Sequence, residues 1–173
     1  IAAARQGARV TLLEATSKVG GVMAFCPGMP WGGAYPMDEI IGGLIEELTV
    51  RLASMDPPAA EKRNCTLDNF GPEIIYDHDL ATLTMFEMLE EAGIRVRLGT
   101  IAIAPDMDGD TVSAVQCCDR QGPFSIKSKY VIDCSGDGDI SAKAGVPYVL
   151  GDAAGNMMAV TISFFMMGVD WNR

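Results

Sequence analysis

The segment from Tyr130 to Gly145 constrains the fold most, because an apolar run leads into a glycine-rich acidic turn and then into a short helical pattern. It reads YVIDCSGDGDISAKAG. The run Tyr130–Cys134 predicts a buried strand, and the pattern from about 139 to 144 predicts a helix closed by Gly145. In α/β proteins, ligands bind beyond the carboxyl ends of such strands. The segment therefore predicts an α/β fold with a ligand site at this turn.

The acidic residues of the turn also resemble the start of a calcium-binding loop. Asp133, Ser135, Asp137 and Gly138 match its early positions, but Ala144 stands where the closing bidentate Glu is required. A strand, rather than a helix, is expected before the loop. Calcium is therefore the lesser alternative, and a nucleotide phosphate loop is disfavoured because no Gly-Lys-Ser/Thr follows the glycines. We expect no metal ligands.

The first residues have the pattern of the second half of a βαβ unit. An alanine-rich helix ends at Gly7, and the apolar strand within Ala8–Ala15 carries an acid, Glu14, near its end. In dinucleotide-binding units, such an acid accepts hydrogen bonds from ribose hydroxyls. An acid at a strand end is also common for solubility alone. The pair Gly20 and Gly21 strengthens the nucleotide interpretation, because glycines let backbone N–H groups approach an anion.

The middle of the chain predicts two helices separated by a loop. Helical spacing of apolar residues favours a helix from Met37 to about Met55, and residues 54–73 are expected to form a surface loop because they are polar and contain prolines. A second helix is expected from about Asp79 to Ala92. His78, the only histidine in the chain, precedes that helix, and we assign it no catalytic role.

The second half predicts strands joined by tight turns. The segments IRVRLGTIAIA, DGDTVSAVQCCD and FSIKSKYVIDCSG have strand patterns, and the turn between the first two explains Asp108 and Asp110 better than a ligand role does. We expect a small antiparallel β-meander beside the parallel strands.

Charge and hydropathy exclude two classes of partner. The net charge of -10 argues against nucleic acid, which requires clustered Lys and Arg. No apolar stretch is long enough to span a membrane, the best being Met157–Gly168. The N-terminus lacks the pattern of a signal peptide, so a cytoplasmic location is expected.

Five segments occur in the order found in FAD-dependent oxidoreductases of the glutathione-reductase type. The most specific is VIDCSGDGDISAKAGVPY, which is similar to the family pattern of a strand, Ala-Thr-Gly-Asp-Gly-Asp and Ala-Gly-x-Pro; here Cys134 and Ser135 replace Ala and Thr. The others are GARVTLLEATSKVGG, GGLIEEL, MLEEAGIRVRLGT and VTISFFMMGVD. The sequence most resembles the branch that includes heterodisulfide-reductase-A-like and fumarate-reductase-like flavoproteins.

This resemblance implies a Rossmann-like FAD-binding domain, truncated at both ends, and a set of cofactor contacts. Glu14 would hold the adenosine ribose, and the backbone near Ala102 would meet the adenine. The remaining contacts are expected at the pyrophosphate and at the end of the returning strand: Gly20, Gly21, Ser135, Gly136, Asp137 and Gly138.

The expected domains follow from the same resemblance. Residues 1–24 and 79–156 would form the FAD-binding domain, 25–78 an inserted helix and loop region, and 157–173 the start of a substrate or cap domain.

The resemblance implies a flavin that exchanges hydride or electrons with a small-molecule substrate or a redox partner protein. No catalytic acid or base is identifiable. Cys26 could approach the flavin as a thiol, although simple packing is the stronger interpretation. Iron–sulfur clusters of some relatives would need cysteines outside this chain. The alternatives are a flavoprotein of RNA modification or thiazole synthesis, and a non-catalytic nucleotide-binding module.

We expect the 173-residue chain to bind FAD weakly by itself, because the glycine-rich turn that faces the pyrophosphate in this family lies outside it. Equilibrium dialysis with FAD measures this directly. Tight binding would contradict the expectation.

Overall fold

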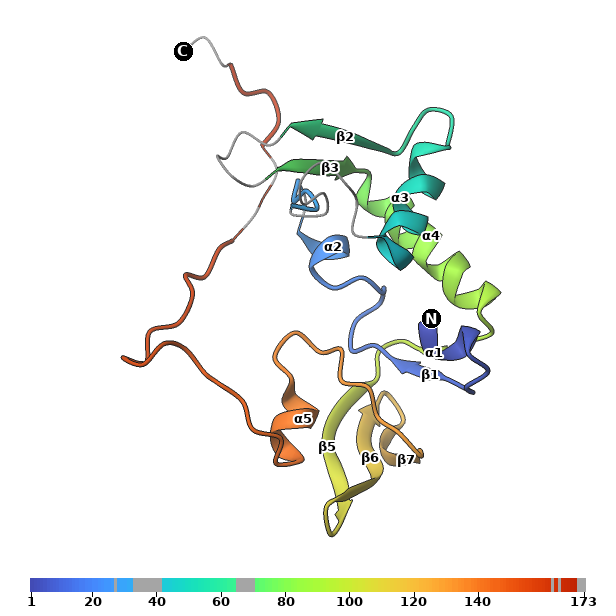
Figure 1. Ribbon diagram of the computed structural model, residues 1–173, viewed down its shortest axis with the longest axis vertical. Helices are drawn as coiled ribbons and strands as arrows, with labels where there is room; N and C mark the ends of the chain where they lie inside the picture. The colour runs from blue at the N-terminus through green and yellow to red at the C-terminus, as the bar shows by residue number, and fades with distance from the viewer. Residues whose placement is uncertain (27, 33–41, 65–70, 163, 165, 171–173) are drawn as a thin grey trace. The chain divides into compact units, whose positions relative to one another are not determined.

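The structure is a computed structural model that describes residues 1–26, 28–32, 42–64, 71–162, 164 and 166–170. The chain divides into two compact units. Unit 1 comprises residues 1–8, 18–93 and 162–173, and unit 2 comprises residues 9–17 and 94–161. Each unit is described by itself, with element labels as in Figure 1.

Unit 1 packs two helices against an antiparallel strand pair. Its elements are α1 (Ala2–Arg5), α2 (Val22–Phe25), α3 (Gly43–Ala53), β2 (Ala60–Asn64), β3 (Pro72–Tyr76) and α4 (His78–Glu91). Helices α3 and α4 lie side by side (Figure 1). Leu52 of α3 and Ile74 of β3 are both 0% exposed. The core also contains Trp31, Leu48, Ala59, Ala60, Tyr76, Ala81 and Met88.

Helix α4 has a polar cap at its start and a glycine after its end. The Asp77 carboxylate accepts hydrogen bonds from the N–H groups of Asp79 and Leu80, at 3.0 and 2.9 Å. Gly93, beyond the last turn, has φ +67°, a conformation that favours glycine. The predicted second helix is thus confirmed. Helix α3 begins at Gly43, and residues 37–41 of the helix predicted from Met37 lie outside the described residues.

The predicted surface loop over residues 54–73 is wrong in part, because strand β2 forms within it. Strand β2 pairs antiparallel with β3, from Ala60 opposite Tyr76 to Asn64 opposite Pro72. The side chains of residues 61–64 are exposed, so the strand has no alternating apolar pattern that the sequence could reveal. Backbone pairing with the buried strand β3 holds it in place.

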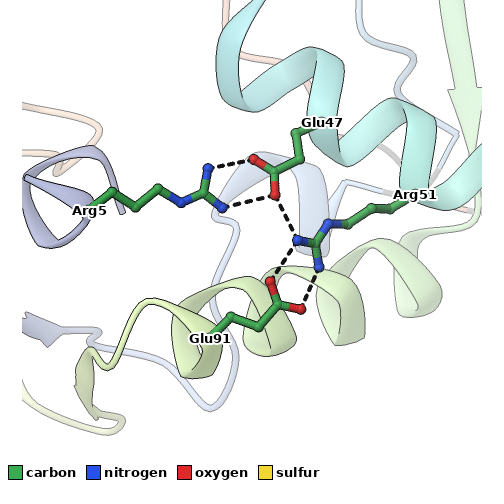
Figure 2. A network of polar contacts seen from close by, with 4 residues as sticks. All are labelled: Arg5, Glu47, Arg51 and Glu91. Atoms are coloured by element: carbon green, nitrogen blue, oxygen red, sulfur yellow. Dashed lines mark hydrogen bonds and ion pairs between the residues drawn. The ribbon is translucent and has the colours of Figure 1, made fainter.

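Four charged side chains connect α1, α3 and α4. Figure 2 shows Arg5 of α1 facing Glu47, and Arg51 lying between Glu47 and Glu91. Arg5 donates to both carboxylate oxygens of Glu47, at 2.6 and 2.8 Å. Arg51 donates to Glu47 at 2.7 Å and to both oxygens of Glu91, at 2.7 and 2.6 Å. Single bonds of the network therefore join residues up to 42 positions apart in sequence.

These bonds favour the ionised form of both acids. Hydrogen bonding by Arg5, with a further contribution from Arg51, lowers the pKa of Glu47 to about 2. Hydrogen bonding by Arg51 lowers the pKa of Glu91. Because all four side chains contact solvent, the network specifies how the helices meet more than it adds to the free energy of folding.

Unit 2 combines a parallel strand pair with an antiparallel meander. Its elements are β1 (Thr11–Leu13), β4 (Arg95–Arg97), β5 (Ile101–Asp108), β6 (Thr111–Asp119), β7 (Gly122–Lys127) and α5 (Asp139–Lys143). Strand β1 runs parallel to β4, with Leu12 opposite Val96. The meander has the order β5-β6-β7, and α5 packs beside β5 (Figure 1). The α/β fold class is confirmed, with both expected kinds of sheet.

The predicted strand Tyr130–Cys134 is wrong, because these residues have no regular structure. Tyr130 is 88% exposed and Ile132 69%. Among the described residues, no strand lies beside this run to bond its backbone groups, and a strand needs such a partner. The predicted helix that follows is confirmed as α5.

The apolar segment near the C-terminus also lacks regular structure. Met158 and Val160 are 91% and 94% exposed. Within the described ranges, no helix has the length and apolar character needed to cross a membrane.

We predict that Glu47→Gln lowers the midpoint of urea unfolding at pH 7. The lowered pKa of Glu47 means that its ionised form stabilises the folded state above its ordinary pKa of 4.5, and that this contribution is lost as the pH falls toward about 2. The difference between variant and parent should therefore shrink over that range. Glu46→Gln is the control, because Glu46 is exposed on the same helix. A difference that does not change with pH would contradict the prediction.

Candidate cofactor site

Strand β1 ends with a carboxylate held in a defined position. The Glu14 N–H donates to Arg97 O, and the Thr100 N–H donates to Glu14 O, both at 3.0 Å, so the backbone extends the pairing with β4. Oε1 of Glu14 accepts the N–H and the hydroxyl of Thr16, each at 2.8 Å. The acid is half-buried. It therefore lies oriented at the carboxyl end of the parallel pair, where ligands bind in α/β sheets.

The glycine-rich acidic turn before α5 is organised by Asp133. Its Oδ1 accepts the Ser135 N–H at 3.0 Å and the Ser135 hydroxyl at 2.7 Å. Its Oδ2 accepts the Ser141 N–H at 2.8 Å, in the first turn of α5. The carboxylate thus closes the turn and caps the helix from outside it.

The electrostatics of the turn agree with this structural role. The Ser135 hydroxyl, followed by the Ser141 N–H, holds the pKa of Asp133 well below its usual range. Both carboxylate oxygens accept hydrogen bonds, Oδ1 from Ser135 of the turn and Oδ2 from Ser141 of α5. Asp133 was absent from the predicted site residues; the available signal was the Asp-x-Ser spacing, which favours a side-chain to backbone turn.

The predicted residues of the turn have different surroundings. Ser135 is engaged with Asp133, and its Oγ also accepts the Asp139 N–H at 3.3 Å. Asp137 is exposed. Gly138 has φ +66° immediately before α5. A Cβ added at Gly136 or Gly138 would meet no atom within 4 Å, so the backbone here is open to the approach of a bound group.

Ala102 packs in the same hydrophobic core as residues from strand β1 and from helix α5, which follows the turn. It lies opposite Cys117 in the meander, just before a register shift. Ala102, Leu13 and Ile140 all pack in the cluster around Val115 and Cys117. Leu13 precedes Glu14, and Ile140 follows the glycine turn. The six predicted site residues of unit 2 therefore extend from elements that share one core.

The glycine pair Gly20 and Gly21 lies in unit 1. Gly20 has φ +114°, a conformation that favours glycine, and a Cβ there would lie 2.6 Å from Cε of Met85 on α4, the end of a flexible side chain. Gly21 has φ +52° before α2, and a Cβ there would meet nothing within 4 Å. Backbone approach to an anion is thus open at Gly21, whereas Gly20 lies against Met85.

A surface pocket of unit 2 lies on the meander. It is lined by Ile103, Gln116, Cys117, Pro123, Phe124 and Ser125. None of these is a predicted site residue. In the described part of the chain, no cluster of His, Cys, Asp and Glu has an arrangement that could hold a metal ion.

We predict that Asp133→Ala destabilises unit 2 by about 1 kcal/mol, because the Ser141 N–H loses its acceptor. Amide hydrogen exchange without cofactor should show faster exchange at Ser135 and Ser141. Asp137→Ala is the matched control, an exposed acid in the same turn. Unchanged exchange at Ser141 in Asp133→Ala would contradict the capping role.

Similar folds occur among solved protein structures. The fold resembles OxyS anhydrotetracycline hydroxylase from Streptomyces rimosus, with a TM-score of 0.58, 18% identity, and coverage of 86% of this chain and 31% of that chain. It also resembles THI4 from Thermovibrio ammonificans, with a TM-score of 0.54, 18% identity, and coverage of 81% of this chain and 53% of that chain. The fold also resembles BexE, with a TM-score of 0.57, 14% identity, and coverage of 82% of this chain and 30% of that chain. At these identities the similarity concerns the fold, and the chain spans about half of THI4 or less than a third of the other two.

A family comparison covers more of the sequence. None of the curated proteins compared with the chain matches it. The family model described as FAD dependent oxidoreductase matches residues 1–173. Because that match includes every residue, the chain belongs to the FAD-dependent oxidoreductase family.

Proposed function

We propose that the protein binds FAD and uses the flavin to exchange hydride or electrons with an organic substrate or a redox partner protein. The observation that carries the proposal is the family match over residues 1–173. When bound, the flavin supplies the redox chemistry, and the protein supplies binding, orientation and electrostatics.

The residues of unit 2 are compatible with the adenosine half of FAD. The Glu14 carboxylate is held at a strand end, where it would accept hydrogen bonds from ribose hydroxyls. The open backbone at Gly136 and Gly138 would lie against the cofactor. We further propose that Ser135, Asp137 and the backbone at Ala102 line this site, and that Gly20 and Gly21 approach the pyrophosphate.

The finer assignment is to the glutathione-reductase type, in the branch with heterodisulfide-reductase-A-like and fumarate-reductase-like proteins. It rests on the motif around Asp133. Family membership favours an oxidoreductase over a non-catalytic nucleotide-binding module. No described feature favours RNA modification or thiazole synthesis. An iron–sulfur cluster would need cysteines outside this chain, and a cytoplasmic location remains a prediction.

The division into domains is also part of the proposal. Residues 1–24 and 79–156 would bind FAD, 25–78 would form an insertion, and 157–173 would begin a substrate or cap domain.

We predict that Glu14→Ala weakens FAD binding about tenfold or more, because hydrogen bonds to a charged acceptor are lost. Equilibrium dialysis over a wide range of FAD concentrations measures the dissociation constants. Glu14→Gln, which keeps one acceptor oxygen, should lie between the parent and Glu14→Ala. Glu61→Ala serves as control, because Glu61 is an exposed strand residue of unit 1.

Equal FAD affinities for the parent and Glu14→Ala would refute the proposed role of Glu14 and leave the flavin function untouched. The broader function has a separate test. A colourless protein, made from its complete coding sequence and not reconstituted by added FAD, would refute the flavin function.

A further inference from the structure

The carboxyl end of strand β1 is tied to the segment that follows strand β4. The Glu14 N–H donates to Arg97 O, and the Thr100 N–H donates to Glu14 O, both at 3.0 Å. Two residues further on, the Gly99 N–H donates to Thr16 O at 2.9 Å. Backbone hydrogen bonds from this second segment therefore fix the positions of both Glu14 and Thr16, and they use neither side chain.

Thr16 places both of its donors on one oxygen of Glu14. Its N–H and its hydroxyl each donate to Oε1, at 2.8 Å. One carboxylate oxygen has room for about two hydrogen bonds, so Oε1 is fully used. Among the described residues, Oε2 accepts no hydrogen bond. The two bonds limit rotation of the carboxylate and leave Oε2 as the atom that can accept a donor from a ligand.

The turn at Asp133 provides a comparison within the same unit. Its Oδ1 also accepts the N–H and the hydroxyl of the residue two positions on, Ser135, at 3.0 and 2.7 Å. Its Oδ2, however, accepts the Ser141 N–H at 2.8 Å. Both oxygens of Asp133 are thus used within the chain. The same local pattern closes a loop at Asp133, whereas at Glu14 it leaves an acceptor available.

The charges near Glu14 favour a neutral donor over an anion. The ion pairs of the described residues do not include Glu14. Arg97, whose carbonyl contacts Glu14, has other partners for its guanidinium. It donates to Oδ2 of Asp119 at 2.9 Å and lies over the Phe124 ring, 4.6 Å from its centroid. The carboxylate would therefore repel an anionic group, whereas neutral hydroxyl groups would donate to it.

We propose that Thr16 is a positioning residue for adenosine: by holding Oε1, it reserves Oε2 of Glu14 for the ribose hydroxyls. The two neighbouring hydroxyls of ribose are neutral donors, which suits an oxygen with room for about two hydrogen bonds. Thr16 is exposed and Glu14 is half-buried, so a ligand can reach this end of the strand. The choice of ribose as the ligand rests on the proposed FAD function. The hold of Thr16 on Glu14 does not.

The test is equilibrium dialysis of Thr16 variants with FAD and with AMP, which contains the ribose but no flavin. Thr16→Val keeps the shape of the side chain and removes the hydroxyl, whereas Thr16→Ser keeps the hydroxyl. We expect Thr16→Val to weaken both ligands about threefold, less than the effect of a full hydrogen bond, because the Thr16 N–H still holds Oε1. Thr16→Ser should restore the parent affinity. Thr11→Val is the matched control, because Thr11 is an exposed residue of β1.

A double-mutant cycle separates positioning from a general effect on the fold. If Thr16 acts through the carboxylate, Thr16→Val should leave the affinities unchanged once Glu14 is replaced by alanine. A structural role would instead give the same loss in both backgrounds. Amide exchange without ligand provides a second check. The N–H groups of Gly99 and Thr100 donate to backbone carbonyls, so their exchange in Thr16→Val should match the parent.

Three outcomes would overturn the proposal: equal affinities of Thr16→Val and the parent, a loss that Thr16→Ser does not restore, or the same loss in the Glu14→Ala background. Faster exchange at Gly99 and Thr100 in Thr16→Val would also overturn it, because the role of Thr16 would then be structural.

The two ligands distinguish this proposal from the flavin function. AMP binding with the expected coupling, but without FAD binding, would refute the flavin function and support the positioning role. FAD binding without the coupling would refute the positioning role only. If neither ligand binds, both are refuted.

Discussion

Backbone pairing on both sides of Ile74 is the constraint on which the described part of unit 1 depends. Ile74 lies opposite Lys62 of β2 and also pairs with Trp31. Its side chain is fully buried in the core of unit 1. Strand β3 therefore positions an exposed neighbouring strand, the Trp31 ring and, through Asp77, the start of α4. The stacking of the Trp31 ring on Tyr76 is a consequence of this pairing.

Unit 2 has a corresponding anchor in Asp133, but a side chain supplies it rather than the backbone. The carboxylate uses both oxygens to hold Ser135 and the start of α5. The acidic residues of the turn therefore have different roles. Asp133 shapes the loop, while Asp137 stays exposed and the glycines leave the backbone open. The motif, for which calcium binding was the lesser alternative, forms an internally hydrogen-bonded turn.

Local patterns in the sequence predicted those elements whose ends carry their own signals. Helix α4 has Asp77 before it and Gly93 after it, and the hairpin between β5 and β6 has Gly109 at its turn. Strand β2 could not be predicted, because most of its side chains are exposed and so do not alternate between apolar and polar residues. The strand predicted from Tyr130 is wrong for the opposite reason. Its residues are largely apolar, but a strand forms only beside a second strand, and the local sequence does not specify whether one is present.

The candidate sites show the same limit. Glu14 could be selected from its place at a strand end, and the glycines from their spacing. The environment of His78 could not, because Gly28, which donates to it, lies 50 residues away in sequence. Nor could the crowding of Gly20 by Met85, which depends on how α4 packs. Sequence patterns identify residues with suitable chemistry, whereas tertiary contacts determine which of their atoms remain free.

The charged residues of strand β2 also affect how copies of the chain meet in solution. Glu61, Lys62 and Arg63 are exposed side by side on a strand at the edge of its sheet, and charges there oppose the addition of a strand from another molecule. Met158, Val160 and Ile162 have no such protection; they alternate along an exposed, uncharged run. Self-association through sheet edges is thus opposed at β2, whereas an exposed, uncharged apolar run such as residues 157–162 favours aggregation.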